Sequence, residues 1–169
     1  MRTGECLSAD LDIARRARAL QAWVEDCRAR MRARWPEVDF DSDHWQLNTK
    51  YKTRLQDVSF APALADFNGR DPAYGLALKC LMTGIALKGD VKVPHDHMRG
   101  WRLLSRVEVP LHQLRRAHLR GLEDALVEQA QTSPSSAGSL TGDLSRLRAH
   151  VDVTGAQGVT DRMAWSLAP

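Results

Sequence analysis

The chain has 169 residues, 43% of them hydrophobic, and a formal net charge of +3, which is the size and balance of one folded domain with a sizeable core. No apolar run approaches the length of a membrane span, and no signal-peptide segment is apparent, so we expect a cytoplasmic protein. The three cysteines (Cys6, Cys27, Cys80) fit neither a zinc motif nor a disulfide framework, so we expect free thiols, no metal and no cofactor.

The positive charge is carried mainly by arginine, which far outnumbers lysine. Arginine is the better ligand for phosphates and base edges, so this composition is compatible with nucleic-acid binding. A GC-rich genome produces the same Arg-rich and Ala-rich composition, so the arginine content alone decides nothing.

Residues 1–36 are predicted to form a long basic amphipathic helix, from Ser8 to about Arg34, that ends at Trp35-Pro36 because the residue before proline is disfavoured in a helix. Its apolar positions recur at helical spacing. They are Ile13, Ala17, Leu20, Val24, Cys27 and Met31. The helix either packs on the rest of the chain, associates with a second copy, or lies on nucleic acid.

Residues 37–70 keep apolar anchors without a sustained period, so we expect a partly irregular segment. A short strand or turn is predicted at 46–51 and a short helix at 62–67. Lys50 and Lys52 flank an aromatic residue, a pattern that suits phosphate contact combined with base stacking.

The next helix is predicted to open at Asp71-Pro72, where Asp caps the first turn and Pro fits the first helical position, and to stop at Gly89. It is apolar nearly all round, so we place it at the centre of a bundle. Lys79 lies on this helix and contacts DNA only if its side of the helix remains in water.

Two more helices follow, at 94–107 and from Pro110 to about Gln129, each with an apolar face. Arginines occupy the opposite faces, and we call these five residues the arginine face. It is either a solvated surface or a phosphate-binding surface. Its members are Arg99, Arg102, Arg106, Arg116 and Arg120.

After Gln131 the composition shifts. Residues 132–142 are rich in Ser, Gly and Thr and are predicted to be a linker. One short amphipathic helix is expected over 140–151, and residues 153–169 are expected to be weakly ordered. The predicted organisation is therefore a basic helix (1–36), a helical domain (37–131) and a linker with a flexible tail (132–169).

No catalytic signature is apparent. His112-Gln113-Leu114-Arg115 fits the H-x-x-R box of tyrosine recombinases, which binds the scissile phosphate, but no tyrosine follows Tyr74 to act as the nucleophile. His95 and His97 supply two imidazoles without a third or fourth metal ligand. We therefore expect no enzymatic activity, unless a pocket gathers His95, His97 or His118.

Anchor residues with a characteristic spacing run through residues 40–128. They are Phe40-Asp41-Ser42-Asp43, Trp45, Leu47, Val58-Ser59-Phe60, Ala65-Asp66-Phe67, Leu76-Ala77-Leu78-Lys79, Trp101-Arg102-Leu103-Leu104 and Leu119-Arg120-Gly121-Leu122-Glu123-Asp124-Ala125-Leu126. This segment resembles the N-terminal core-binding region of bacterial and phage site-specific integrases of the tyrosine-recombinase type. The resemblance implies a small helical domain that grips DNA opposite a catalytic domain, and the catalytic domain is absent here.

We therefore expect an all-α bundle of four or five helices that binds duplex DNA in integration or recombination, in a mobile-element context, without cutting it. The arginine face is the first choice for phosphate contacts, and Lys50, Lys52 and Lys79 are second choices. The alternative is a protein-interaction or dimerisation module that uses the helix from Ser8 to Arg34.

Overall fold

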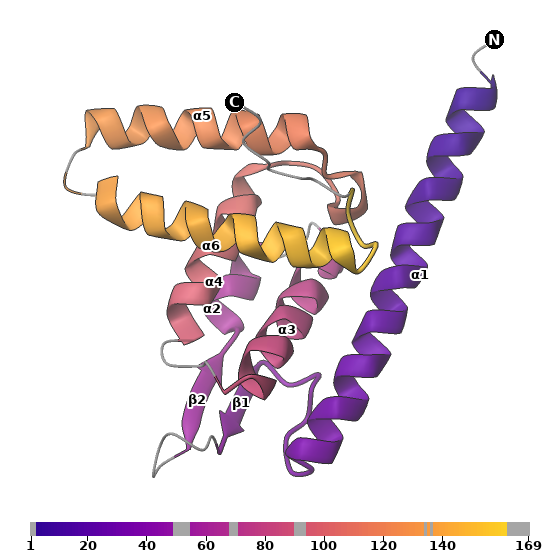
Figure 1. The fold of residues 1–169 in the computed structure, drawn as a ribbon, viewed down its shortest axis with the longest axis vertical. Helices are drawn as coiled ribbons and strands as arrows, with labels where there is room; N and C mark the ends of the chain where they lie inside the picture. The colour runs from indigo at the N-terminus through magenta and orange to yellow at the C-terminus, as the bar shows by residue number, and fades with distance from the viewer. Residues whose placement is uncertain are drawn as a thin grey trace.

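The computed structural model describes residues 3–48, 55–67, 71–89, 94–133, 135 and 137–161, and these are mostly helical (Figure 1). The described part holds six α-helices where four or five were predicted, together with two short strands, so the all-α prediction is confirmed with one or two more helices than expected. The elements are α1 (Thr3–Arg34), β1 (His44–Leu47), β2 (Gln56–Ser59), α2 (Ala61–Ala65), α3 (Pro72–Leu87), α4 (Pro94–Arg102), the 3₁₀ turns η1 (Leu103–Arg106) and η2 (Leu111–Gln113), α5 (Arg116–Thr132) and α6 (Ala137–Ala156).

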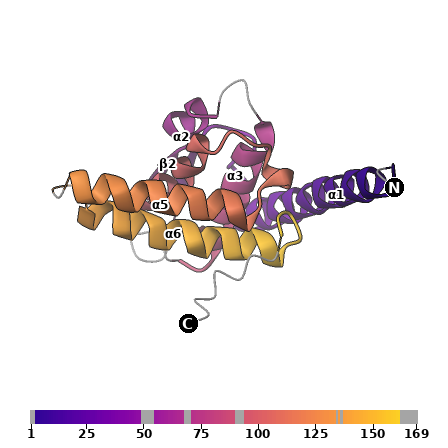
Figure 2. The same cartoon turned by 90° about the horizontal axis from the view of Figure 1, so that it is seen from above.

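Helix α1 begins earlier than predicted and ends where predicted, at Arg34. Its stripe from Leu20 to Met31 is buried and packs mainly on α3, while its N-terminal end projects beyond the other helices (Figures 1 and 2). The buried Trp35 closes the helix, and its indole Nε1 donates to the Asn48 carbonyl at 3.0 Å.

The irregular segment contains a two-stranded antiparallel sheet in which Trp45 pairs with Val58 and Leu47 pairs with Gln56. Alternate residues of both strands face the core, as the two-residue period of a strand requires. The Trp45 ring meets Phe60 edge to face at 4.5 Å between centroids. The short strand or turn predicted at 46–51 coincides with β1 at Gln46 and Leu47, Asn48 is beyond the strand, and residues 49–51 lie outside the described residues. Helix α2 accounts for the predicted short helix as far as Ala65.

Helix α3 is the buried centre of the bundle, as predicted. Asp71 caps it by accepting a hydrogen bond from the Ala73 amide at 3.0 Å, and its second carboxylate oxygen accepts from the Leu111 amide at 2.8 Å. Gly89, with φ of 77°, stops the helix in a conformation that favours glycine.

The two arginine-bearing helices are shorter than predicted. Helix α4 gives way to η1 after Arg102, and the prediction of a helix starting at Pro110 is wrong, because α5 begins only at Arg116. Between them η2 and the extended Leu114 insert two leucines, Leu111 and Leu114, fully into the core. The Tyr74 hydroxyl donates to the Val109 carbonyl at 2.7 Å and fixes this segment on α3.

The short helix predicted over 140–151 is confirmed as part of a longer helix, whereas the prediction of a linker is wrong for residues 137–142 and that of a weakly ordered tail is wrong for residues 153–161. Helix α6 spans twenty residues and packs on α4 and α5, and Leu147, Val151 and Val159 are completely buried. One apolar cluster therefore runs from Leu20 on α1 to Val159 beyond α6. Residues 162–169 of the predicted tail lie outside the described residues.

Candidate nucleic-acid interface

Arg99 belongs to a closed ring of four alternating charges between α4 and α6. Its guanidinium donates to the Asp143 carboxylate at 3.1 Å and to the Ser139 hydroxyl at 2.8 Å. The Arg146 guanidinium lies 3.6 Å from the Asp143 carboxylate and 3.5 Å from the Asp96 carboxylate. Asp96 also lies 4.0 Å from the Arg99 guanidinium, which closes the ring. Asp143 is buried and requires these cations as partners, so Arg99 primarily holds α6 on α4.

Arg102 and Arg106 point toward two other elements. The Arg102 Nε atom pairs with the Asp66 carboxylate, just after α2, at 2.6 Å. The exposed Arg106 donates to the Gln129 side chain on α5 at 2.9 Å. The three arginines predicted to share one stripe are therefore held by partners on three different elements.

Arg116 and Arg120 lie one helical turn apart on the exposed side of α5, and we call them the α5 arginine pair. Neither makes a hydrogen bond or an ion pair within the described residues, and the first turn of α5 contains no acid. The opposite face of α5 is held in the core by Leu119, Leu122 and Leu126. The pair thus presents two uncompensated cations near the positive end of a helix.

Lys79 is less available to DNA than the α5 arginine pair. Lys79 is only 6% exposed, and its ammonium donates to the Asp41 carbonyl at 2.8 Å, lies 3.3 Å from the Asp43 carboxylate and sits over the Phe60 ring at 5.6 Å. These contacts tie α3 to the segment before β1. Lys50 and Lys52 lie outside the described residues.

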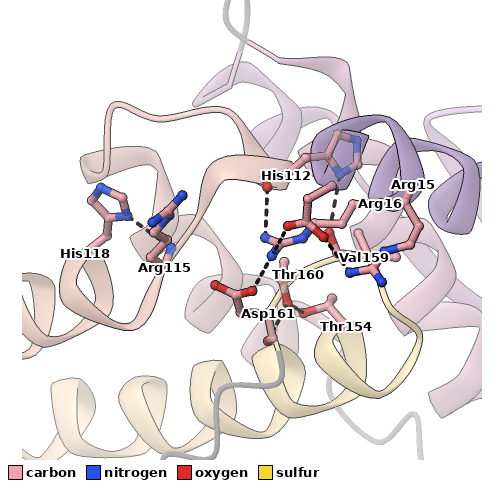
Figure 3. Close-up of polar contacts among 10 residues, drawn as sticks. Arg15, Arg16, His112, Arg115, His118, Thr154, Val159, Thr160 and Asp161 are labelled. Carbon is pink, nitrogen blue, oxygen red and sulfur yellow. Dashed lines mark hydrogen bonds and ion pairs between the residues drawn. The ribbon is translucent and has the colours of Figure 1, made fainter. Parts of the chain in front are cut away.

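The two fixed members of the H-x-x-R box do not converge. The His112 imidazole approaches the Val159 carbonyl at 3.4 Å, whereas Arg115 caps α5, with its amide donating to the His118 ring at 3.0 Å (Figure 3). Accepting this hydrogen bond gives half-buried His118 a local structural role.

Sequence reasoning missed a buried cation, Arg16, which is 8% exposed and joins three parts of the chain (Figure 3). It pairs with Asp12 at 2.6 Å and with Asp161 beyond α6, and it donates to the His112 carbonyl at 3.0 Å. The spacing from Asp12 to Arg16 is an ion-pair signal on a predicted helix. The Asp161 contact had no signal, because Asp161 lies in the part predicted to be a weakly ordered tail.

A hollow of about 590 Å³ lies beside Arg16 and is lined partly by the chain reversal at Gly158. The described contacts of Arg16 already direct its guanidinium to two carboxylates and one carbonyl. The hollow is therefore a weaker anion site than the exposed α5 arginine pair.

A cluster of aromatic and imidazole rings fills the α4–α6 interface. The His150 ring nitrogen lies 3.1 Å from the His97 carbonyl, and the two imidazole rings are 5.9 Å apart. Burial lowers the pKa of His150 to about 4, so this histidine is neutral at pH 7. No group of three or more potential metal ligands was found within the described residues, and the side chain of His95 is outside them.

No protein-family model, curated protein or solved structure matches this chain. Among the described helices, none combines the length and the apolar character that crossing a membrane requires.

Proposed function

We propose that the chain is a cytoplasmic DNA-binding module of the integrase or recombinase type, which contacts duplex phosphates through the α5 arginine pair and does not cleave DNA. The observation that carries this proposal is the exposure of Arg116 and Arg120 without a described partner, one turn apart at the start of α5. Arg116 and Arg120 can therefore bind phosphates without first breaking an ion pair within the described residues.

The other arginines of the predicted face are ranked by their partners. Arg106 is exposed and bound to a neutral glutamine, so its charge remains available to a phosphate. Arg99 and Arg102 would have to leave carboxylates, and the removal of Arg99 would weaken the α4–α6 contact. The proposed surface is therefore smaller than the five-residue arginine face, with Arg106 as a supporting contact.

The proposal includes no strand cleavage because the sequence offers no attacking tyrosine after Tyr74. The separated directions of His112 and Arg115 also give a scissile phosphate no common binding point (Figure 3). What remains of the integrase resemblance is the DNA-gripping part.

The dimerisation alternative has less support. The part of the apolar stripe of α1 that includes Leu20 and Val24 is buried within the chain's own core, so this part offers no surface to a second copy of the folded protein. An Asp substitution at either position would unfold α1 from the bundle and would not report on dimerisation.

The test is the binding of random-sequence duplex DNA across a salt series from about 50 to 200 mM, read by fluorescence anisotropy. We expect the wild-type affinity to fall steeply with salt. The Arg116→Gln/Arg120→Gln variant should lose about two units of the log–log slope, because each phosphate contact contributes roughly 0.9.

The matched control is Arg18→Gln/Arg32→Gln, which removes the same charge from exposed positions on α1 that have no ion pair within the described residues. It should lower the slope by less than about one unit. Equal losses in the two variants, or no binding by the wild type at low salt, would reject the α5 arginine pair as the DNA contact.

A further inference from the structure

Two cysteines from different helices meet in the interior. Cys27 lies on the buried stripe of α1 and is 4% exposed, and Cys80 lies on α3 and is 1% exposed. Both are free thiols, and the Cys27 sulfur lies 3.9 Å from the Cys80 carbonyl oxygen. Fifty-three residues of sequence separate them, so only the packing of α1 on α3 brings them together.

The two cysteines line the same cavity. It holds about 200 Å³, is partly open, and lies between α1, α3 and α6, with His150 and Val153 contributing from α6. Lys88, Arg30 and the Asp26 carboxylate that pairs with Arg30 also line it, which leaves one positive charge in excess among these three. A small polar oxidant therefore has both space to reach the sulfurs and positive charge nearby to stabilise a thiolate.

The surroundings make the two sulfurs unequal. The pKa of Cys27 is lowered, first by the side-chain hydrogen bond with Cys80 and further by Arg30 and Thr83, although burial and the Asp26 carboxylate oppose the shift. The pKa of Cys80 is raised by the same hydrogen bond and by burial. Of the two sulfurs, Cys27 therefore loses its proton more readily and Cys80 retains its proton.

We propose that Cys27 and Cys80 form a reactive dithiol site that hydrogen peroxide converts to a disulfide linking α1 to α3. The Cys27 thiolate attacks one peroxide oxygen, so that an S–O bond forms, the O–O bond breaks and hydroxide leaves. Cys27 is then a sulfenic acid. The Cys80 sulfur loses its proton and displaces the oxygen of this acid, which leaves as water as the S–S bond forms.

The consequence of oxidation is a covalent link between the long helix and the centre of the bundle. Helix α1 is otherwise held there by the packing of its buried stripe and by contacts such as those of Arg16. Closing a loop of this length reduces the freedom of the unfolded chain, so the oxidised form should melt roughly 5–10 °C higher. This inference does not depend on the DNA-binding proposal.

The experiment uses the full chain with Cys6→Ser, which leaves only these two thiols. The folded protein is treated with hydrogen peroxide, quenched, unfolded and alkylated, and its intact mass is measured. We expect the loss of two hydrogens, no alkylation, a raised melting temperature, and full reversal by dithiothreitol. The oxidation of Cys6 in the wild-type chain, read from the mass of the peptide that contains it, calibrates the peroxide dose.

Single variants in the Cys6→Ser background test the order of the steps. With Cys80→Ala, Cys27 should accumulate as a sulfenic acid that dimedone traps; with Cys27→Ala, Cys80 should stay unmodified at the same dose. The proposal is overturned if both thiols stay free at a dose that oxidises Cys6, if only intermolecular disulfides form, or if Cys80 reacts alone as fast as Cys27. The first of these outcomes needs no substitution in the core, so misfolding of a variant cannot obscure it.

Discussion

At the scale of single residues, side-chain type and spacing could place a charge on a helix but could not choose its partner. Arg99 and Arg116 looked alike in sequence, as outward arginines opposite an apolar face. In the structure Arg99 neutralises the buried Asp143 on α6, whereas Arg116 has no partner within the described residues. The difference depends on α6, a helix much longer than the one expected there, so it lay beyond sequence reasoning.

The buried His150 gives the stability of the protein a defined pH dependence. Its pKa is about 4 in the folded chain, chiefly because burial disfavours the charged ring, and is close to 6.5 when unfolded. Above pH 6.5 the His150 ring is neutral in both the folded and the unfolded chain, so it does not make the free energy of unfolding depend on pH. As the pH falls from 6.5 toward 4, the unfolded chain binds a proton that the folded chain does not. The free energy of unfolding should therefore drop by roughly 3 kcal/mol over that window.

This pH dependence can be measured by urea unfolding at several pH values between 7 and 4. His150→Gln keeps a donor for the His97 carbonyl but cannot titrate, so its unfolding free energy should lack this part of the slope. His44→Gln on β1, where the ring is half exposed, is the control and should retain it. An unchanged slope in the His150 variant would mean that the ring is protonated in the folded state as well.

At the scale of elements, the helices with strong local signals were predicted and those that depend on neighbours were not. Helix α3 has an Asp cap, a Pro at its first position, an apolar body and a terminal Gly, and it was found with these boundaries. Helix α6 begins in a Ser/Gly/Thr-rich stretch that is typical of a linker. It is held by tertiary contacts with α4 and α5, which override its weak local preference.

The close approach of α4 and α6 rests on Gly100. A Cβ atom there would lie 2.8 Å from the Asp143 carbonyl oxygen and 3.1 Å from the Leu147 amide nitrogen, and backbone atoms cannot rotate away as a side chain can. Gly100→Ala should therefore lower the free energy of unfolding by about 1–3 kcal/mol, measured by urea denaturation.

Gly121 on α5 is the matched control, since a Cβ atom at this position meets nothing within 4 Å. Gly121→Ala should instead stabilise the protein by roughly 0.5–1 kcal/mol, because alanine is the better helix former. Similar effects of the two substitutions, with the same sign, would show that α4 and α6 are not packed as closely as described.

At the scale of the whole molecule, the fold class was predictable because apolar periodicity indicates helices directly. Which distant parts of the chain contact one another was not predictable. The chain joins its first helix to the residues beyond α6 through Arg16 and Asp161, which are 145 positions apart. The carbonyl of His112 also accepts a hydrogen bond from Arg16 (Figure 3), and Asp12, on the same helix as Arg16, completes the arrangement. Contacts of this kind depend on where every intervening element turns.

This long-range pair should couple the stability of α1 to the segment after α6. Asp161→Asn leaves the 8%-exposed Arg16 with one carboxylate partner, and we expect a loss of about 1–3 kcal/mol in the free energy of unfolding. A double-mutant cycle with Arg16→Met should give a coupling energy of at least about 1 kcal/mol. Arg15 pairs with the same Asp12 but is 74% exposed, so Arg15→Met should change stability by less than about 0.5 kcal/mol. If the Arg16 and Asp161 effects simply add, the end of the chain does not hold α1, and the packing of α1 on α3 alone keeps that helix in place.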